Sequence, residues 1–207
     1  MAENVPLEPR HLIEAAGVAR ETLAPAADRD WSAKAGTLDW DCRATLDHMV
    51  NAPLFHGTNL AMRSKQRLNS VRAGNPTASV SDLIASMEHS ATILARVASA
   101  TPPNERGFHP AGMADAQGFV ALSSNELLLH THDIATGLGL TFEAPAELSG
   151  LVLRRLFPWA PSDLEPWAAL LWLTSRGSLP GRPDGGGDWM SHPAPLSEWD
   201  GAIPRRR

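Results

Sequence analysis

Four long segments of this chain repeat apolar residues at spacings of three and four, and this periodicity restricts the fold more than any other feature. The first runs from Glu8 to about Ala27, and the second from Asp41 past Met62. The third covers 81–100 and the fourth 115–136. Such spacings gather side chains on one face of an α-helix. No stretch of useful length alternates as a half-buried strand would, so the sequence predicts an all-α four-helix bundle.

The chain after the fourth segment predicts a shorter helical appendage. Pro145 opens and Pro158 closes a fifth helix. A sixth helix is expected to start at Ser162 as N-cap, with Glu165 at the capping-box position, and to end at Gly177. We therefore divide the chain into a bundle, 1–140, and a C-terminal extension, 141–207.

The C-terminal tail is rich in Gly and Pro. Residues 185–187 are three consecutive glycines, which predict a flexible loop. Trp189 and Trp199 lie beyond it, and we expect these large apolar rings to bring part of the tail back onto the bundle.

Charge and composition narrow the classes of function. The 207 residues include 18 Lys and Arg against 23 Asp and Glu, a formal net charge of −5. A general nucleic-acid binder needs a basic face, so we expect no nucleic-acid partner. No apolar run approaches the roughly 18 residues that predict a membrane span. The first residues after Met1 do not resemble a signal peptide. We expect a cytoplasmic monomer or homodimer that acts on small molecules.

Glu126 and His130 are the most informative pair of polar residues. They are four positions apart, so the two side chains lie on one face of the fourth helix, one turn apart, and can share a metal ion. The alternative is a surface Glu–His pair of a few tenths of a kcal/mol. His132 lies about 200° around the helix from His130 and is expected to be a surface or packing residue.

A third ligand has to come from another helix, and His48 is the best candidate. It lies between two apolar positions of the second helix, where a hydrogen-bonded core histidine is the alternative interpretation. His56 is about 12 Å further along the axis, so we expect it to line the same cavity and contact a cofactor there. The other histidines, His11, His89, His109 and His192, have no partner at ligand spacing and are interpreted as ordinary residues.

Three segments together resemble the DinB-like metalloenzymes, most closely the branch that contains the N-terminal domain of mycothiol-dependent maleylpyruvate isomerase. Trp40–Val50, WDCRATLDHMV, is similar to the motif of the second helix. Glu126–Asp133, ELLLHTHD, is similar to the branch's E-x-x-x-H-x-x-D pattern on the fourth helix. Pro166–Gly177, followed by LPGR and Trp189, resembles the region after the bundle in many actinobacterial members.

The resemblance implies a bundle with one long crossover connection and a metal held by His48, Glu126 and His130. The family usually carries zinc, and nickel and other divalent ions occur among its relatives. Three protein ligands with one open position are typical of catalytic zinc, and the fourth ligand in these enzymes is thought to be the thiol of mycothiol. Cys42, the single cysteine, lies at the start of the second helix and is expected to be structural.

Two further residues are candidate catalytic groups. Asp133, three residues after His130, is expected either to orient a ligand imidazole or contact a substrate, or else to be an exposed aspartate at the helix end. Arg176, like Arg182, is expected either to bind an anionic substrate or to be a surface arginine.

Three functions remain open from the sequence. The first is a metal- and thiol-dependent transferase or isomerase acting on a small electrophilic substrate. The second is a non-catalytic protein of the same fold that binds a metal or small ligand. The third is a metal-dependent hydrolase, with hydroxide in place of thiolate.

Overall fold

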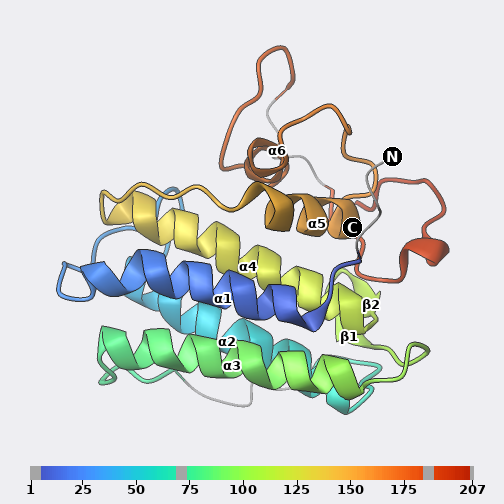
Figure 1. Ribbon diagram of the computed structural model, residues 1–207, viewed down its shortest axis with the longest axis horizontal. Helices are drawn as coiled ribbons and strands as arrows, with labels where there is room; N and C mark the ends of the chain where they lie inside the picture. Colours follow the sequence, from blue (N-terminus) through green and yellow to red (C-terminus); the bar gives the residue numbers. More distant parts are fainter. Residues whose placement is uncertain (1–5, 69–73, 184–188, 206–207) are drawn as a thin grey trace.

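The computed structural model describes residues 6–68, 74–183 and 189–205. The predicted glycine loop at 185–187 and the first residues of the chain lie outside this part. Figure 1 shows four long helices side by side, with two shorter helices on the α4 side. The helices are α1 (Pro9–Leu23), α2 (Cys42–Ala61), α3 (Val80–Ala100), α4 (Ala116–Gly137), α5 (Ala146–Leu156) and α6 (Pro166–Leu173). The prediction of an all-α protein is confirmed.

A small hairpin interrupts the connection from α3 to α4, where no strand was predicted. Strand β1 (Gly107–His109) pairs antiparallel with β2 (Gly112–Ala114). Gly107 lets this hairpin approach α2, because a Cβ atom there would lie 2.6 Å from the carbonyl oxygen of Asn59. The hairpin therefore closes one end of the groove between α2 and α4.

Side-chain caps fix the starts of the three helices that follow α1. Asp41 accepts a hydrogen bond from the backbone N–H of Ala44 at the start of α2, and Asp115 accepts one from Gly118 at the start of α4. Ser79 and Asp82 form a reciprocal capping box at the start of α3. These bonds satisfy amide groups that the helices leave without partners.

The predicted start of the sixth helix at Ser162 is wrong. The N-cap is Glu165, whose carboxylate accepts from the N–H groups of Trp167 and Ala168 at 3.0 and 2.7 Å. The reason is Pro166, which suits the first position of a helix and disfavours helical backbone in the residue before it. The helix also ends at Leu173, short of the predicted Gly177.

Helices α2 and α3 run in the same direction. Near their starts, the Arg43 guanidinium donates to the carbonyl of Ala78. Near their ends, Gly57 lies against Leu94, since a Cβ atom added to Gly57 would lie 3.7 Å from the Cα of Leu94. The chain between Ala61 and Val80 must therefore return to the opposite end of the bundle, which makes it a long crossover connection.

The hydrophobic core continues from the bundle into the appendage. Helix α5 packs on α4, and α6 packs on α5. Buried side chains of both short helices belong to the same apolar cluster as those of the bundle, with Leu148 and Trp167 as examples. Trp189 also packs against this cluster. Within the described part of the chain, no helix is long and apolar enough to cross a membrane.

Arg155 is the principal polar link between the appendage and the bundle. Its side chain on α5 is buried and forms an ion pair with Asp115, the residue that caps α4. It also donates to the carbonyl groups of His192 and Pro193, each at 3.2 Å. One guanidinium group thus joins α5, the start of α4 and the C-terminal segment.

Replacing Arg155 with Met should lower the free energy of unfolding by roughly 3–5 kcal/mol, because it leaves the Asp115 carboxylate without its buried partner. Arg154→Met, at the exposed neighbouring position, should change it by less than about 0.5 kcal/mol. Urea denaturation followed by tryptophan fluorescence measures both values. Equal losses in the two variants would contradict the assigned role of Arg155.

Candidate metal centre

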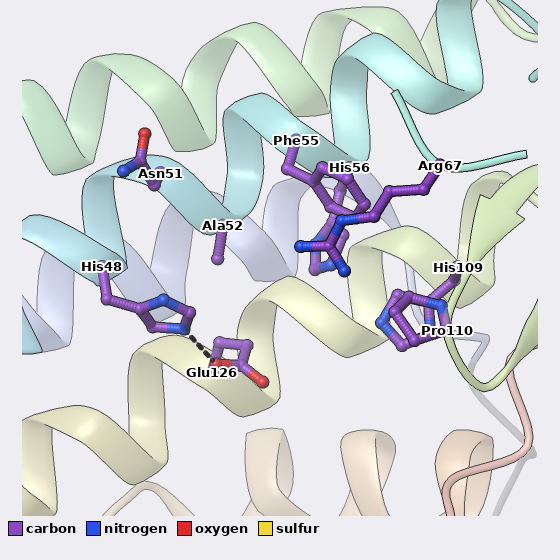
Figure 2. Close-up of a pocket in the computed structure, with 9 residues that line it drawn as sticks. All are labelled: His48, Asn51, Ala52, Phe55, His56, Arg67, His109, Pro110 and Glu126. Carbon is purple, nitrogen blue, oxygen red and sulfur yellow. Dashed lines mark hydrogen bonds and ion pairs between the residues drawn. The ribbon is translucent and has the colours of Figure 1, made fainter. Parts of the chain in front are cut away.

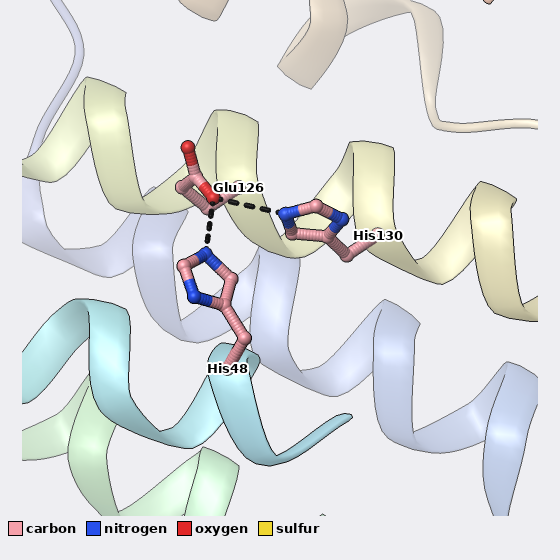
Figure 3. A group of neighbouring side chains, drawn as sticks. All are labelled: His48, Glu126 and His130. Atoms are coloured by element: carbon pink, nitrogen blue, oxygen red, sulfur yellow. Dashed lines mark hydrogen bonds and ion pairs between the residues drawn. The ribbon is translucent and has the colours of Figure 1, made fainter. Parts of the chain in front are cut away.

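Three side chains from two helices converge on one point (Figure 3). Nε2 of His48, on α2, lies 2.9 Å from Oε2 of Glu126, on α4. Nε2 of His130, one turn along α4, lies 3.0 Å from the same oxygen. One ligand atom from each residue lies within 4.8 Å of the other two, so the group could hold a metal ion.

Helix geometry explains why these residues meet. Glu126 and His130 share a face of α4, and α2 packs against that face in the opposite direction, which places His48 across from them. Ser123 and Ser124 are small and buried on the preceding turn. His132 points elsewhere, and its ring packs edge-on against Trp167 at a centroid distance of 5.8 Å.

Asp133 and Arg176 form a layer of charge behind His130. Nδ1 of His130 lies 3.0 Å from Oδ2 of Asp133. The guanidinium of Arg176 holds both oxygens of Asp133, with Nε at 2.9 Å from Oδ1 and the terminal nitrogen at 2.7 Å from Oδ2. Asp133 is buried, so its position is that of a group that orients the imidazole. Arg176 in turn positions Asp133.

The raised pKa of His130 indicates that its neighbours favour positive charge at the centre. A neutral imidazole has a single N–H, so His130 cannot donate to both Asp133 and Glu126 unless it is protonated. Burial would lower its pKa, but the bonds to Asp133 and Glu126 raise the pKa to about 9. Burial would likewise raise the pKa of Glu126, yet the bonds from His130 and His48 hold that pKa well below its usual range.

The donor set fits a divalent metal. Asp133 keeps the proton of His130 on Nδ1, which leaves Nε2 free to act as a ligand once it gives up its own proton. The second nitrogen donor, His48, and the Glu126 carboxylate complete a set of two imidazoles and one carboxylate. This is a set that zinc accepts in catalytic sites.

A first cavity of about 280 Å³ opens beside the triad, between α2, α4 and the hairpin (Figure 2). His48 and Glu126 lie at one end, and His109 and Pro110 lie at the other. The lining residues are His48, Asn51, Ala52, Phe55, His56, Arg67, His109, Pro110 and Glu126. Nδ1 of His56 and the hydroxyl of Ser123 share a hydrogen bond of 2.6 Å.

His56 and His109 are neutral residues of this cavity. Their rings are 5.3 Å apart, and both also lie near Phe119. Burial lowers the pKa of His56 to about 3 and that of His109 to about 4. His56 lines the cavity beside His48, as the sequence predicts, and its contact with a cofactor stays a prediction. The sequence gives no sign that His109, interpreted as an ordinary residue, lies beside His56.

A second cavity of about 340 Å³ adjoins the first and shares His109, Pro110 and Glu126 with it. It lies between α4 and the C-terminal appendage, and both Glu126 and His130 line it. Asn125, Ser175, Arg176, Trp189 and Ser191 contribute the appendage side and the floor. The side-chain oxygen of Asn125 is buried without a hydrogen-bond partner in the described residues. The triad is thus exposed to two cavities.

Three other residues of the predicted motifs have clear positions. Trp40 lies over the triad, with its ring centroid 5.1 Å from that of His48, a contact that the helical pattern does not predict because Trp40 precedes α2. Cys42 is fully buried, and burial raises its pKa to about 11. Arg182 lies over the ring of Trp172 at 5.8 Å, outside both cavities.

No protein-family model matches this chain, and no curated protein or solved structure matches it either. The functional argument therefore rests on the chemistry of the site.

Replacing His48, Glu126 or His130 with Ala should each remove most of the bound metal, because two protein ligands do not fix the geometry of the ion. Asp133→Asn should weaken metal binding by roughly 10- to 100-fold, since it removes the carboxylate that orients His130 and pairs with Arg176. His132→Ala should leave the metal content unchanged. Elemental analysis after equilibration with zinc measures this, and metal loss in the His132 variant alone would contradict the triad.

The neutral histidines predict a loss of stability in mild acid. In the unfolded chain a histidine has a pKa near 6.5, whereas the folded values are about 3 and about 4. Below pH 6.5 these two histidines bind protons in the unfolded state but stay neutral in the folded state. The free energy of unfolding therefore falls as the pH falls below this value. For His56 alone the loss between pH 6.5 and 5 is about 2 kcal/mol.

The measurement is urea denaturation of the metal-free protein at a series of pH values. His130 does not disturb this window, because its raised pKa makes its contribution change only above pH 6.5. His56→Gln should reduce the dependence of the free energy of unfolding on pH. His89→Gln, at an exposed position on α3, should leave it as in the wild type. If the free energy of unfolding of the wild type did not change between pH 6.5 and 5, His56 and His109 would not be neutral in the folded protein.

Proposed function

We propose that this chain is a DinB-like, metal-dependent enzyme that uses an external thiol, such as mycothiol, to modify or isomerise a small electrophilic substrate. The observation that carries the proposal is the exposure of the triad to two cavities, which both include Glu126 in their walls. A reaction between two small molecules requires that both approach one centre, whereas a protein that only binds a metal has no need of two routes.

The ligand set supports zinc as the metal, with nickel as another divalent ion that it accepts. Two neutral imidazoles and one carboxylate leave a Zn²⁺ centre with a net charge of +1. A zinc ion held there would favour the thiolate form of a thiol that binds beside it, and the thiolate is the reactive nucleophile.

The thiol is proposed to come from outside the protein. Cys42 is the single cysteine, and it is fully buried with a raised pKa, so it is not available as a nucleophile. The two adjoining cavities offer room for a low-molecular-weight thiol in one and its partner in the other.

The protein's own residues mainly hold the metal ligands in position and shape the first cavity. Arg176 and Asp133 fix the ring of His130, and Trp40 covers the outer side of His48. His56 and His109 shape the first cavity but are poor bases, since their pKa values lie near 3 and 4. In the reaction, the thiol gives its proton to solvent, a bond forms between the sulfur and the electrophilic carbon, and the π electrons of that carbon move to the conjugated acceptor. Conjugation results if the bond stays and water returns a proton to the carbon next to the acceptor. Isomerisation results if the carbon–sulfur bond breaks after rotation, which restores the double bond.

The topology supports the family assignment within this proposal. The crossover between α2 and α3 is the connection that the DinB-like resemblance implies, and the triad occupies the matching positions on the second and fourth helices.

Cobalt-substituted protein should develop sulfur-to-metal charge-transfer absorption in the near ultraviolet when mycothiol is added. His48→Ala should abolish this band, and the matched His132→Ala variant should retain it. Candidate electrophiles should then be consumed only in the presence of the thiol. If fully metal-loaded protein shows no band with any cellular thiol, the thiol-dependent function is wrong, and hydrolysis or simple ligand binding would have to replace it.

A further inference from the structure

Arg67 is an exposed cation in the wall of the first cavity, and no carboxylate among the described residues pairs with it. It lies in the connection after α2, and its guanidinium carbon is 5.3 Å from the centre of the Phe55 ring. Figure 2 shows the guanidinium extending back over Phe55 and His56, on the side of the cavity that faces Glu126. Other arginines near the cavities have ion-pair partners among the described residues, as seen for Arg63, Arg106, Arg155 and Arg176.

The rest of the cavity does not neutralise this charge. Glu126 is the single carboxylate among the lining residues, and it lies at the triad, where two histidines bind it. Asn51, Ala52, Phe55 and Pro110 carry no charge. The buried rings of His56 and His109 have pKa values far below 7, so they add no charge either.

We propose that Arg67 binds the carboxylate group of a linear small molecule whose other end reaches the triad. A guanidinium group matches a carboxylate with two parallel hydrogen bonds. Arg67 is the single Arg or Lys among the lining residues, so its one charge matches a singly charged carboxylate better than a phosphate dianion. The reactive end of this molecule rests on the function proposed above, but the carboxylate subsite itself does not.

The geometry also sets the length of the ligand. Arg67 lies at the level of Phe55, and His48 lies seven residues earlier on α2, which corresponds to about 10 Å along the helix axis. The carboxylate and the reacting group must therefore be separated by a chain of several carbon atoms. In the second cavity Arg176 is already bound to Asp133, so the same kind of anchor is absent there among the described residues.

The test compares mercaptohexanoate with mercaptohexanol, which have equal chain lengths and differ in the terminal group. Calorimetric titration of the zinc-loaded protein should show the acid binding roughly tenfold more tightly than the alcohol, as a charged hydrogen-bonded pair typically provides. Arg67→Gln should bring this ratio to about one, and Arg67→Lys should retain part of it. Arg63→Gln is the matched control, because Arg63 lies in the same connection but outside the cavity, and it should keep the wild-type ratio.

The outcomes of this test distinguish failure of the carboxylate subsite from failure of the thiol-dependent function. No binding of either compound would overturn both proposals. Equal binding of acid and alcohol by the wild type, or a ratio that Arg67→Gln does not change, would overturn the carboxylate subsite. A cobalt–thiolate band with mercaptohexanol as strong as with the acid would then leave the thiol-dependent function intact. Preference for the acid without any such band would instead retain the subsite and refute the thiol chemistry.

Discussion

A single line of alternating charges connects the appendage to the centre of the bundle. It begins at Arg176 beyond α6, continues through Asp133 and His130 to Glu126 on α4, and ends at His48 on α2. Each member is held by an opposite or hydrogen-bonding neighbour, which is the condition for burying charges in a protein. The contacts of this line join α2 to α4 and the C-terminal segment to α4. A metal ion at its end would replace protons without changing the positions of the outer partners.

The sequence predicts those parts of the site that depend on local helix geometry. The spacing of Glu126 and His130 fixes a common face, and the same geometry excludes His132. The positions of the first five helices also follow from their apolar stripes and prolines. Even the error at α6 has a local cause, since the backbone preference imposed by Pro166 outweighs the capping potential of Ser162.

The remaining parts of the site depend on contacts between distant segments, which leave no periodic signal. His109 reaches His56 because Gly107 lets the hairpin touch α2, and neither residue marks this approach in the sequence. Arg176 binds Asp133 across 43 positions of the chain. For Arg176 the sequence left open a substrate contact or a surface position, and the observed partner is a third arrangement. Long-range packing decides such roles, and a single sequence does not contain the pairing information.

The distribution of charge around α4 separates the two cavities chemically. Both reach Glu126, but the first contains Arg67, which has no carboxylate partner among the described residues, and the second has its arginine bound to Asp133. Two reactants that reach one centre through adjoining cavities can be distinguished by such a difference, because an anionic group gains a charged hydrogen bond in one cavity and no equivalent partner in the other. The neutral state of His56 and His109 sharpens the difference, since protonated histidines along the first cavity would attract anions over its whole length. With both rings neutral, Arg67 is the cation of this cavity outside the triad, and a ligand is held there by its carboxylate about 10 Å from His48 along the α2 axis. Its opposite end is then the part that faces His48 and Glu126.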